Sequence, residues 1–154
     1  MSFLRAGDTI SGKEGKATIK INGKIEDLYM IKELEATFEK NKEEVKTLGS
    51  RGTGHKSVGW TGTGSVTLYY VSTLFRRLAL EYVRTGKDVY FDITVTNEDA
   101  TSTIGKQTVA LYNCNLDSVI LAKLAVDDEV LEEDADFTFE DFDILDEFGK
   151  PINI

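Results

Sequence analysis

The fold is decided first by the stretch Lys16-Ala17-Thr18-Ile19-Lys20-Ile21-Asn22-Gly23. Apolar and polar residues alternate through its first six positions, which is typical of a strand with one buried face. Asn-Gly is favoured in two-residue hairpin turns, because both turn positions need a positive φ. A second apolar segment follows at about 25–31. The stretch therefore predicts a hairpin near the start of the chain.

Similar alternation recurs along most of the remaining chain. It predicts further strands at about 33–39 (continuing to 45), 66–70, 89–95 and around 109–111, and two more candidate strands at 118–126 and 135–139 complete the set. With the hairpin these make about eight strands. A single proline among 154 residues, together with 13 glycines, fits such a strand-rich chain.

One segment has a helical period instead. Apolar residues recur there at spacings of three and four, most clearly Leu74, Phe75, Leu78 and Tyr82. Ser72 suits the N-cap and Gly86 suits the C-terminal end, so we expect a helix over about 72–85. Its apolar stripe is expected to plug one opening of the β-structure. The predicted fold class is mainly β (α+β), a barrel or sandwich with one flanking helix.

Length and composition place the chain among soluble single domains. We treat residues 1–154 as one domain, since this length can bury a sizeable core. The N-terminus has no signal-peptide pattern, and no stretch approaches the roughly 20 apolar residues of a membrane span. The only cysteine, Cys114, cannot form an internal disulfide. A cytoplasmic protein without membrane anchoring is expected.

The residues that enzymatic chemistry needs are missing or poorly placed. His55 is the only histidine, and it lies in a glycine-rich stretch without a nucleophile elbow nearby. The glycines at 49–64 lack the Lys-Ser/Thr ending of a phosphate-binding loop. The acids at 134–143 lack the register of a calcium loop, and Cys114 has no partner for zinc. We therefore expect no enzyme activity, no cofactor and no metal.

Charge is distributed unevenly along the chain. The net charge is -9, but residues 1–123 carry 17 basic and 15 acidic residues, whereas residues 124–154 carry 12 acids and only Lys150. Such a chain does not suit binding to the outside of DNA, which requires clustered cations. Three phenylalanines, Phe137, Phe139 and Phe142, run through the acidic end and indicate that much of it packs instead of forming a solvated tail.

The stretch at about 44–62 is the strongest candidate for an interaction site. It is predicted to be a long loop, and loops of this length are usually functional or disordered, although an idle surface loop is the plain alternative. We hypothesise that its basic and aromatic residues contact the acidic end of another copy, a head-to-tail pairing that makes rings or filaments. The candidate contact residues are Lys46, Arg51, His55, Lys56 and Trp60 on the loop and Asp141 and Asp143 on the acidic end.

Five ordered blocks resemble the core tail tube protein of PBSX-like prophages and of related contractile-tailed phages and phage-tail-like bacteriocins. They cover most of the chain, from about residue 9 to 144. The blocks are Thr9-Ile10-Ser11-Gly12-Lys13-Glu14-Gly15, Phe38-Glu39-Lys40-Asn41-Lys42, Thr53-Gly54-His55-Lys56, Gly62-Thr63-Gly64 and Phe137-Thr138-Phe139-Glu140-Asp141-Phe142-Asp143.

The resemblance implies a tail-tube-type β-barrel or sandwich that forms hexameric rings. Rings would stack head-to-tail into a tube inside a sheath, with arms at about 1–12 and 144–154 taking part in contacts. Partners would be other copies, the sheath protein, a baseplate or other initiator and a tape measure protein, and DNA would pass without specific binding. The particle would assemble in the host cytoplasm. A small-ligand-binding β-barrel is the alternative that the residues leave open.

Overall fold

The computed structural model describes residues 4–152 of the chain. Over these residues the chain forms eight strands and one α-helix, so the predicted mainly-β class is confirmed. A short 3₁₀ turn at Ala6–Asp8 precedes them. The elements are β1 (Gly15–Ile21), β2 (Lys24–Asp27), β3 (Ile31–Val45), β4 (Gly54–Tyr69), α1 (Leu74–Thr85), β5 (Phe91–Glu98), β6 (Lys106–Leu116), β7 (Glu132–Phe139) and β8 (Asp141–Asp146).

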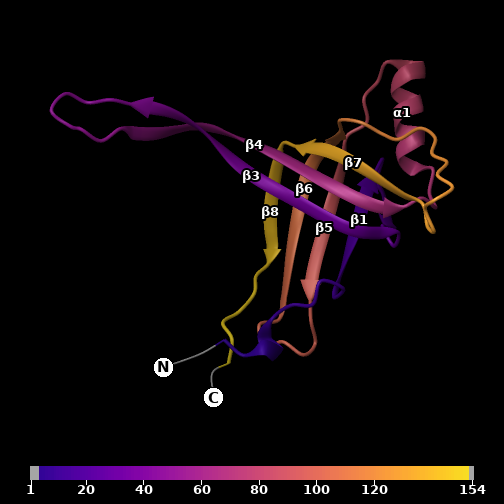
Figure 1. Cartoon of the computed structure of the whole chain (residues 1–154), viewed down its shortest axis with the longest axis horizontal. Helices are drawn as coiled ribbons and strands as arrows, with labels where there is room; N and C mark the ends of the chain where they lie inside the picture. The colour runs from indigo at the N-terminus through magenta and orange to yellow at the C-terminus, as the bar shows by residue number, and fades with distance from the viewer. Residues whose placement is uncertain (1–3, 153–154) are drawn as a thin grey trace.

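The strands form one antiparallel sheet that folds over at β6. Its order is β2-β1-β5-β6-β7-β4-β3, and β8 pairs with β6. Asn113 of β6 adopts a left-handed φ of 53°, which a short polar side chain tolerates. The N-terminal part of β6 pairs with β5 and β8, whereas Asn115 and Leu116 pair with β7. β3, β4 and β7 consequently cross in front of β5, β6 and β8 (Figure 1).

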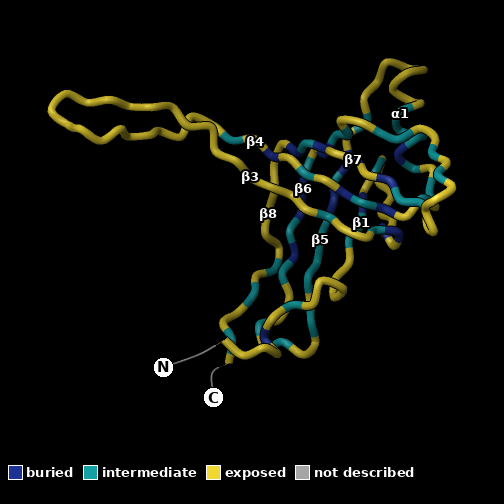
Figure 2. Tube along the Cα trace, viewed as in Figure 1, coloured by how far each residue is buried: buried dark blue, intermediate teal, exposed yellow. Residues whose placement is uncertain are grey.

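One hydrophobic core lies between the two layers. Its fully buried side chains come from both, with Ile19, Ile93 and Cys114 on one side and Val66 and Phe137 on the other, each at most 2% exposed. Figure 2 shows buried positions where the strands cross and a fully exposed β3–β4 projection beyond them. Cys114 is a core residue, since it is 0% exposed, and its burial raises the pKa of the thiol to about 12.

The predicted first hairpin is confirmed. β1 pairs antiparallel with β2, from Thr18 opposite Asp27 to Ile21 opposite Lys24. Asn22 and Gly23 form the turn with φ values of 51° and 83°, the positive pair that this dipeptide accepts. The hairpin places Ile19 in the core, and β2 is shorter than the segment expected at 25–31.

The helix begins two residues after its predicted start and ends where expected. Thr73 is the N-cap residue, while the Ser72 hydroxyl accepts a hydrogen bond from the Leu74 N–H at 3.2 Å. Gly86 ends the helix in the left-handed conformation, with its N–H donating to the Tyr82 carbonyl. This is the usual glycine termination.

Only one turn of the helix packs into the core. Phe75 is buried, and Leu74 and Leu78 pack against the core. Tyr82 is 54% exposed, so the expectation that it helps to plug the β-structure is wrong. The helix lies at one end of the molecule and departs from the sheet as it advances, which leaves its last turns partly in solvent (Figures 1 and 2).

The long loop expected at about 44–62 is a β-hairpin. β3 and β4 pair from Ile31 opposite Leu68 out to Val45 opposite Gly54, so only residues 46–53 connect them. Sequence patterning missed this because the outer half of the hairpin has no buried face, and alternation between buried and exposed residues is what identifies a strand. Backbone pairing alone defines these outer strands.

Two other boundaries also differ from the prediction. Residues 118–126 form no strand: of this segment only Val119 packs against the core, and the segment lies beside α1. Residues 144–146, expected to open a C-terminal arm, belong to β8, which pairs with β6. The strand expected at 118–126 is therefore absent, and β8 is a strand that the sequence did not predict.

Both ends of the chain are fastened to the β5–β6 turn. Asp8 accepts hydrogen bonds from the Thr103 N–H at 2.9 Å and its hydroxyl at 2.6 Å, and these bonds hold the pKa of Asp8 below its usual value. At the other end, the Gly149 N–H donates to the Ile104 carbonyl at 2.7 Å. The outermost parts of the predicted arms, residues 1–3 and 153–154, lie outside the described residues.

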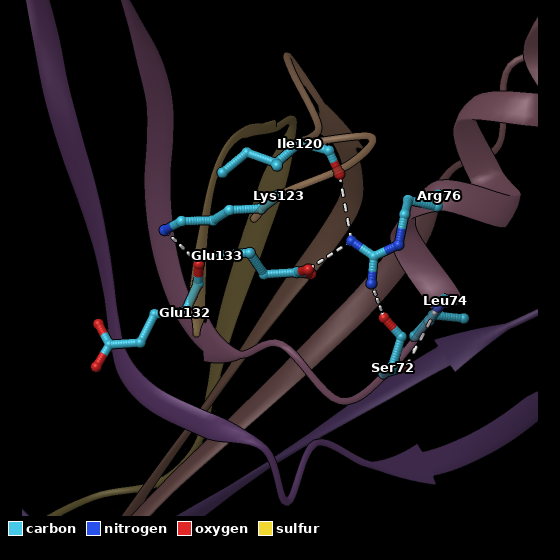
Figure 3. Close-up of polar contacts among 7 residues, drawn as sticks. All are labelled: Ser72, Leu74, Arg76, Ile120, Lys123, Glu132 and Glu133. Carbon is cyan, nitrogen blue, oxygen red and sulfur yellow. Dashed lines mark hydrogen bonds and ion pairs between the residues drawn. The ribbon is translucent and has the colours of Figure 1, made fainter. Parts of the chain in front are cut away.

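A buried ion pair joins the helix to β7 and to the segment between β6 and β7 (Figure 3). Arg76 Nη1 lies 2.5 Å from Glu133 Oε2, with the side chains 16% and 5% exposed. The same guanidinium donates to the carbonyls of Ile120 and Ser72 and stacks over the Tyr70 ring at 4.5 Å. These contacts compensate for removing two charges from water.

Candidate assembly surfaces

The first candidate surface is the hairpin tip, which we define as residues 40–58. It carries Lys46 and Arg51 in the connecting loop, and His55 and Lys56 on β4 opposite Glu44 and Glu43. The tip contains five Lys or Arg residues and two Glu residues. It projects from one end of the molecule without support from another element (Figure 1). A strand pair in such a position is stabilised by a further partner more than by itself.

Trp60 lies at the base of the hairpin, inside an aromatic cluster of its own chain. The ring centroids of Phe38 and Phe142 lie 5.4 and 5.6 Å from that of Trp60, and the centroid of Phe139 lies at 6.0 Å. These separations are typical of favourable aromatic pairs. Phe142 of the acidic end therefore packs on Trp60. The tryptophan lies next to the core and not in a mobile loop.

Asp141 and Asp143 lie on β8, away from the hairpin tip of the same chain. They pair with Tyr112 and Ala110 of β6, and each carboxylate accepts the N–H of the residue that follows it at 2.9 Å. They alternate with Phe142, so they are on the opposite face of β8 from the aromatic cluster. The structure therefore does not bring them together with Lys46, Arg51 or Lys56 within one subunit.

The second candidate surface is the side of the β3-β4-β7 layer that faces away from the core. Val66, Ala135 and Phe137 point inward, so their neighbours along each strand point outward. Strand register aligns these outward positions in rows, such as Glu35, Ser65 and Asp136. We call this set the polar face: Glu33, Glu35, Thr37, Glu39, Thr61, Thr63, Ser65, Thr67, Asp134, Asp136 and Thr138.

The polar face consists of carboxylates and hydroxyls only. Thr67 Oγ1 donates to Asp134 Oδ1 at 2.8 Å across the strands. Lys32 stands at one end of the face, where it is paired with Glu132 at 2.7 Å, and this contact raises the pKa of the lysine. The period-two alternation of β3 and β4 could have located this face in the sequence, but only the register aligns its acids with those of β7.

The third candidate surface is the outer edge of β3. Within residues 4–152, β3 pairs with β4 and with no other strand. Fifteen residues of backbone therefore present an edge that can accept a strand. An exposed edge of this length is a template for pairing with another chain.

Within the described part of the chain, no group of three or more acidic, histidine or cysteine side chains is arranged to hold a metal ion. No helix there is long and apolar enough to cross a membrane.

A family model described as phage tail tube protein matches residues 2–146. The chain belongs to the phage tail tube family. The phage-like element PBSX protein XkdM of Bacillus subtilis (strain 168) is 47% identical over 141 residues, which cover 92% of this chain and 93% of XkdM. The resemblance noted from the sequence blocks is thereby confirmed.

Solved structures share the fold at low sequence identity. A chain in the baseplate of the anti-feeding prophage matches with a TM-score of 0.67 and 12% identity, over 94% of this chain and 97% of that one. A chain of the SPP1 tail tube matches with a TM-score of 0.63 and 11% identity, over 94% and 81%. These structures show that the chain has a tail-tube-like fold, and the family match gives it a structural role in a tail tube.

Proposed function

We propose that this chain forms hexameric rings that stack head-to-tail into the inner tube of a contractile tail or a phage-tail-like particle. The observation that carries the proposal is the combination of a free β3 edge with a wholly acidic and hydroxylated sheet face. An edge allows sheets of neighbouring copies to join, and such a face suits the wall of an aqueous bore.

Strand count supports a ring of this size. The inner layer would contain β3, β4, β7 and the end of β6, which pairs with β7 at Asn115 and Leu116. If six copies each lend four strands spaced about 4.8 Å apart, the circumference is about 115 Å and the bore about 37 Å. This width admits duplex DNA or an unfolded tape measure protein.

The polar face gives the bore its electrostatic character. Glu33, Glu35, Glu39, Asp134 and Asp136 would repeat around the ring, and they repel the phosphates of DNA. A repelling wall lets DNA move through, whereas clustered cations would bind it. The same conduit could serve membrane puncture in a particle without DNA.

The hairpin tip and the two ends of the chain supply further contacts. The tip extends beyond the folded body (Figure 1). It would therefore reach a neighbouring copy in the same ring or in the next one. The outside of the tube would contact the sheath protein, and a baseplate or other initiator would present the first edge. Assembly would take place in the host cytoplasm.

This role requires no catalysis or cofactor. A small-ligand carrier receives less support, because side chains such as Ile93, Cys114 and Phe137 fill the space between the layers. A carrier needs an open interior cavity.

Negative-stain microscopy of the concentrated protein tests the proposal. We expect rings with six-fold class averages, or tubes built from them, either spontaneously or on addition of short tube seeds. Particles that remain monomeric at high concentration with seeds present would contradict it. A Glu35→Lys/Asp136→Lys variant should still form rings, and its tubes should retain DNA fragments that wild-type tubes release.

A further inference from the structure

The segment between β6 and β7, residues 117–131, presents an apolar surface that the fold leaves open. Leu124 and Val126 are 97% and 99% exposed, and Leu121 and Val130 are also largely exposed. Exposed apolar side chains gathered in one segment indicate a contact surface. A cavity of about 450 Å³ adjoins the segment, between Leu121 and the α1 residues Tyr82 and Val83.

This segment is held in a defined position although it contains no strand. Arg76 donates to the Ile120 carbonyl at 3.2 Å, and Lys123 Nζ donates to the Glu132 carbonyl at 2.9 Å (Figure 3). The Asp117 N–H donates to the Asp136 carbonyl at 2.8 Å. The exposed apolar residues are consequently presented on a fixed framework, which reduces the entropy lost when a partner binds.

The hairpin tip has the complementary composition. It exposes Val45, Leu48 and Val58, and Leu48 is 106% exposed. Its five basic and two acidic residues give a net charge of +3. Residues 117–131 carry Asp117, Asp127, Asp128 and Glu129 against Lys123, a net charge of -3. Opposite charges around exposed apolar groups favour association and steer the encounter.

The two surfaces lie at opposite ends of the molecule's long axis. The tip projects from one end, whereas α1 and the segment that precedes β7 are at the other (Figure 1). They cannot meet within one chain in this conformation, but they can meet between copies placed in a row. Such a contact uses two different patches, so it propagates into a ring or a filament.

We propose that the hairpin tip of one copy docks on residues 117–131 of a neighbouring copy. Apolar residues of the tip, led by Leu48, pack against Leu124 and Val126, and the cations around them face Asp127, Asp128 and Glu129. This contact is an alternative to the pairing with Asp141 and Asp143 hypothesised from the sequence. It rests on the proposed assembly into rings, and it specifies which surface receives the tip.

Disulfide trapping tests the contact directly. In assembled tubes, a Leu48→Cys/Leu124→Cys variant should give a ladder of covalent multimers after mild oxidation. A Leu48→Cys/Ile25→Cys variant should give none, because Ile25 is exposed on β2, outside the proposed surface. Cys114 adds no background, since it is fully buried.

The outcomes separate this inference from the proposed function. Tubes that form while the Leu48–Leu124 pair gives no ladder overturn the contact and leave the tube intact. Wild-type protein that forms neither rings nor tubes with seeds contradicts the proposed function itself.

Charge exchange provides a second measurement if the cysteine variants fail to assemble. Reversing three tip charges with Lys46→Glu, Arg51→Glu and Lys56→Glu should lower tube yield about tenfold, a loss equal to a few weak ion pairs. Adding Asp127→Lys, Asp128→Lys and Glu129→Lys to the same chain should restore it. A folded combined variant that shows no recovery contradicts the contact.

Discussion

The two halves of the β3–β4 hairpin have the same backbone pairing but opposite environments. At the base, Phe38 and Trp60 join the aromatic cluster with Phe139 and Phe142. At the tip, residues 40–58 have solvent on both faces. The base is stabilised by its own chain, whereas the tip has nothing of its own chain to pack against. The proposed tube explains why the strand pair continues past the core: another copy would complete its outer part.

The largest effect is expected in the core, where Phe137 of β7 lies opposite Gly64 in the inner half of β4. Phe137→Ala removes a ring that is 1% exposed, and it should lower the free energy of unfolding of the monomer by about 3–5 kcal/mol. Val58→Ala at the tip should change it by less than about 0.5 kcal/mol. Urea unfolding of both variants, followed by circular dichroism, measures the contrast. Equal losses would mean that the tip packs within the monomer.

Ion pairs offer the same comparison between buried and exposed sites. Arg76→Met leaves Glu133 without its partner in a site where that carboxylate is 5% exposed, so we expect a loss of roughly 3 kcal/mol. Lys32→Met breaks the exposed pair with Glu132, where the side chains are 49% and 34% exposed, and should cost clearly less stability than Arg76→Met because water screens the pair. Thermal or urea unfolding of the two variants measures the difference. A larger loss of stability for Lys32→Met would contradict the greater importance of the buried pair.

Glycine-to-alanine substitutions compare the packed inner part of the hairpin with its exposed tip, because each adds a single carbon atom. A Cβ at Gly64 would overlap ring atoms of Phe137, so Gly64→Ala should destabilise the monomer by about 1–3 kcal/mol. Gly52→Ala in the tip meets only the Ser50 hydroxyl at 4.0 Å, and we expect no loss or a slight gain. Unfolding midpoints of the two alanine variants provide the measurement, and an unaffected Gly64→Ala would show that Phe137 can move aside.

The smallest effect is expected where the N-terminal segment meets the β5–β6 turn. Hydrogen bonds from Thr103 lower the pKa of Asp8 below its ordinary value of 3.8. A lowered folded-state pKa contributes stability that is present above pH 3.8 and lost as the pH falls through the lowered value. Asp8→Asn should therefore reduce stability at pH 7, and the difference from wild type should shrink below pH 3.8. A difference independent of pH would assign the effect to shape instead of charge.

Local patterns predicted the elements that border the core. The Asn22-Gly23 turn, the Gly86 helix end and the mainly-β class are as the sequence indicated. Each follows from rules that act over a few residues, such as a positive φ or an alternating face. Family membership was likewise visible in the ordered sequence blocks, and the family match confirmed it.

Features that depend on other parts of the molecule were not predictable in this way. The outer hairpin was expected to be a loop, because no buried face imposes alternation on residues 40–58. Residues 118–126 were expected to form a strand, yet they lie beside α1 and form none. Trp60 was assigned to a partner contact, but its neighbours in space come from Phe38 and from the chain's acidic end. The acids of the polar face are brought together by the register between β3, β4 and β7, which the sequence did not reveal.

Hydrogen exchange at the hairpin tip tests the central claim most directly. Peptides covering residues 40–58 should exchange quickly in the monomer and become strongly protected in assembled tubes. Peptides from β7, which is already paired with β4 and β6 in the monomer, should change little. Tip peptides that exchange equally fast in monomers and tubes would contradict the claim that this half of the hairpin is completed by another copy.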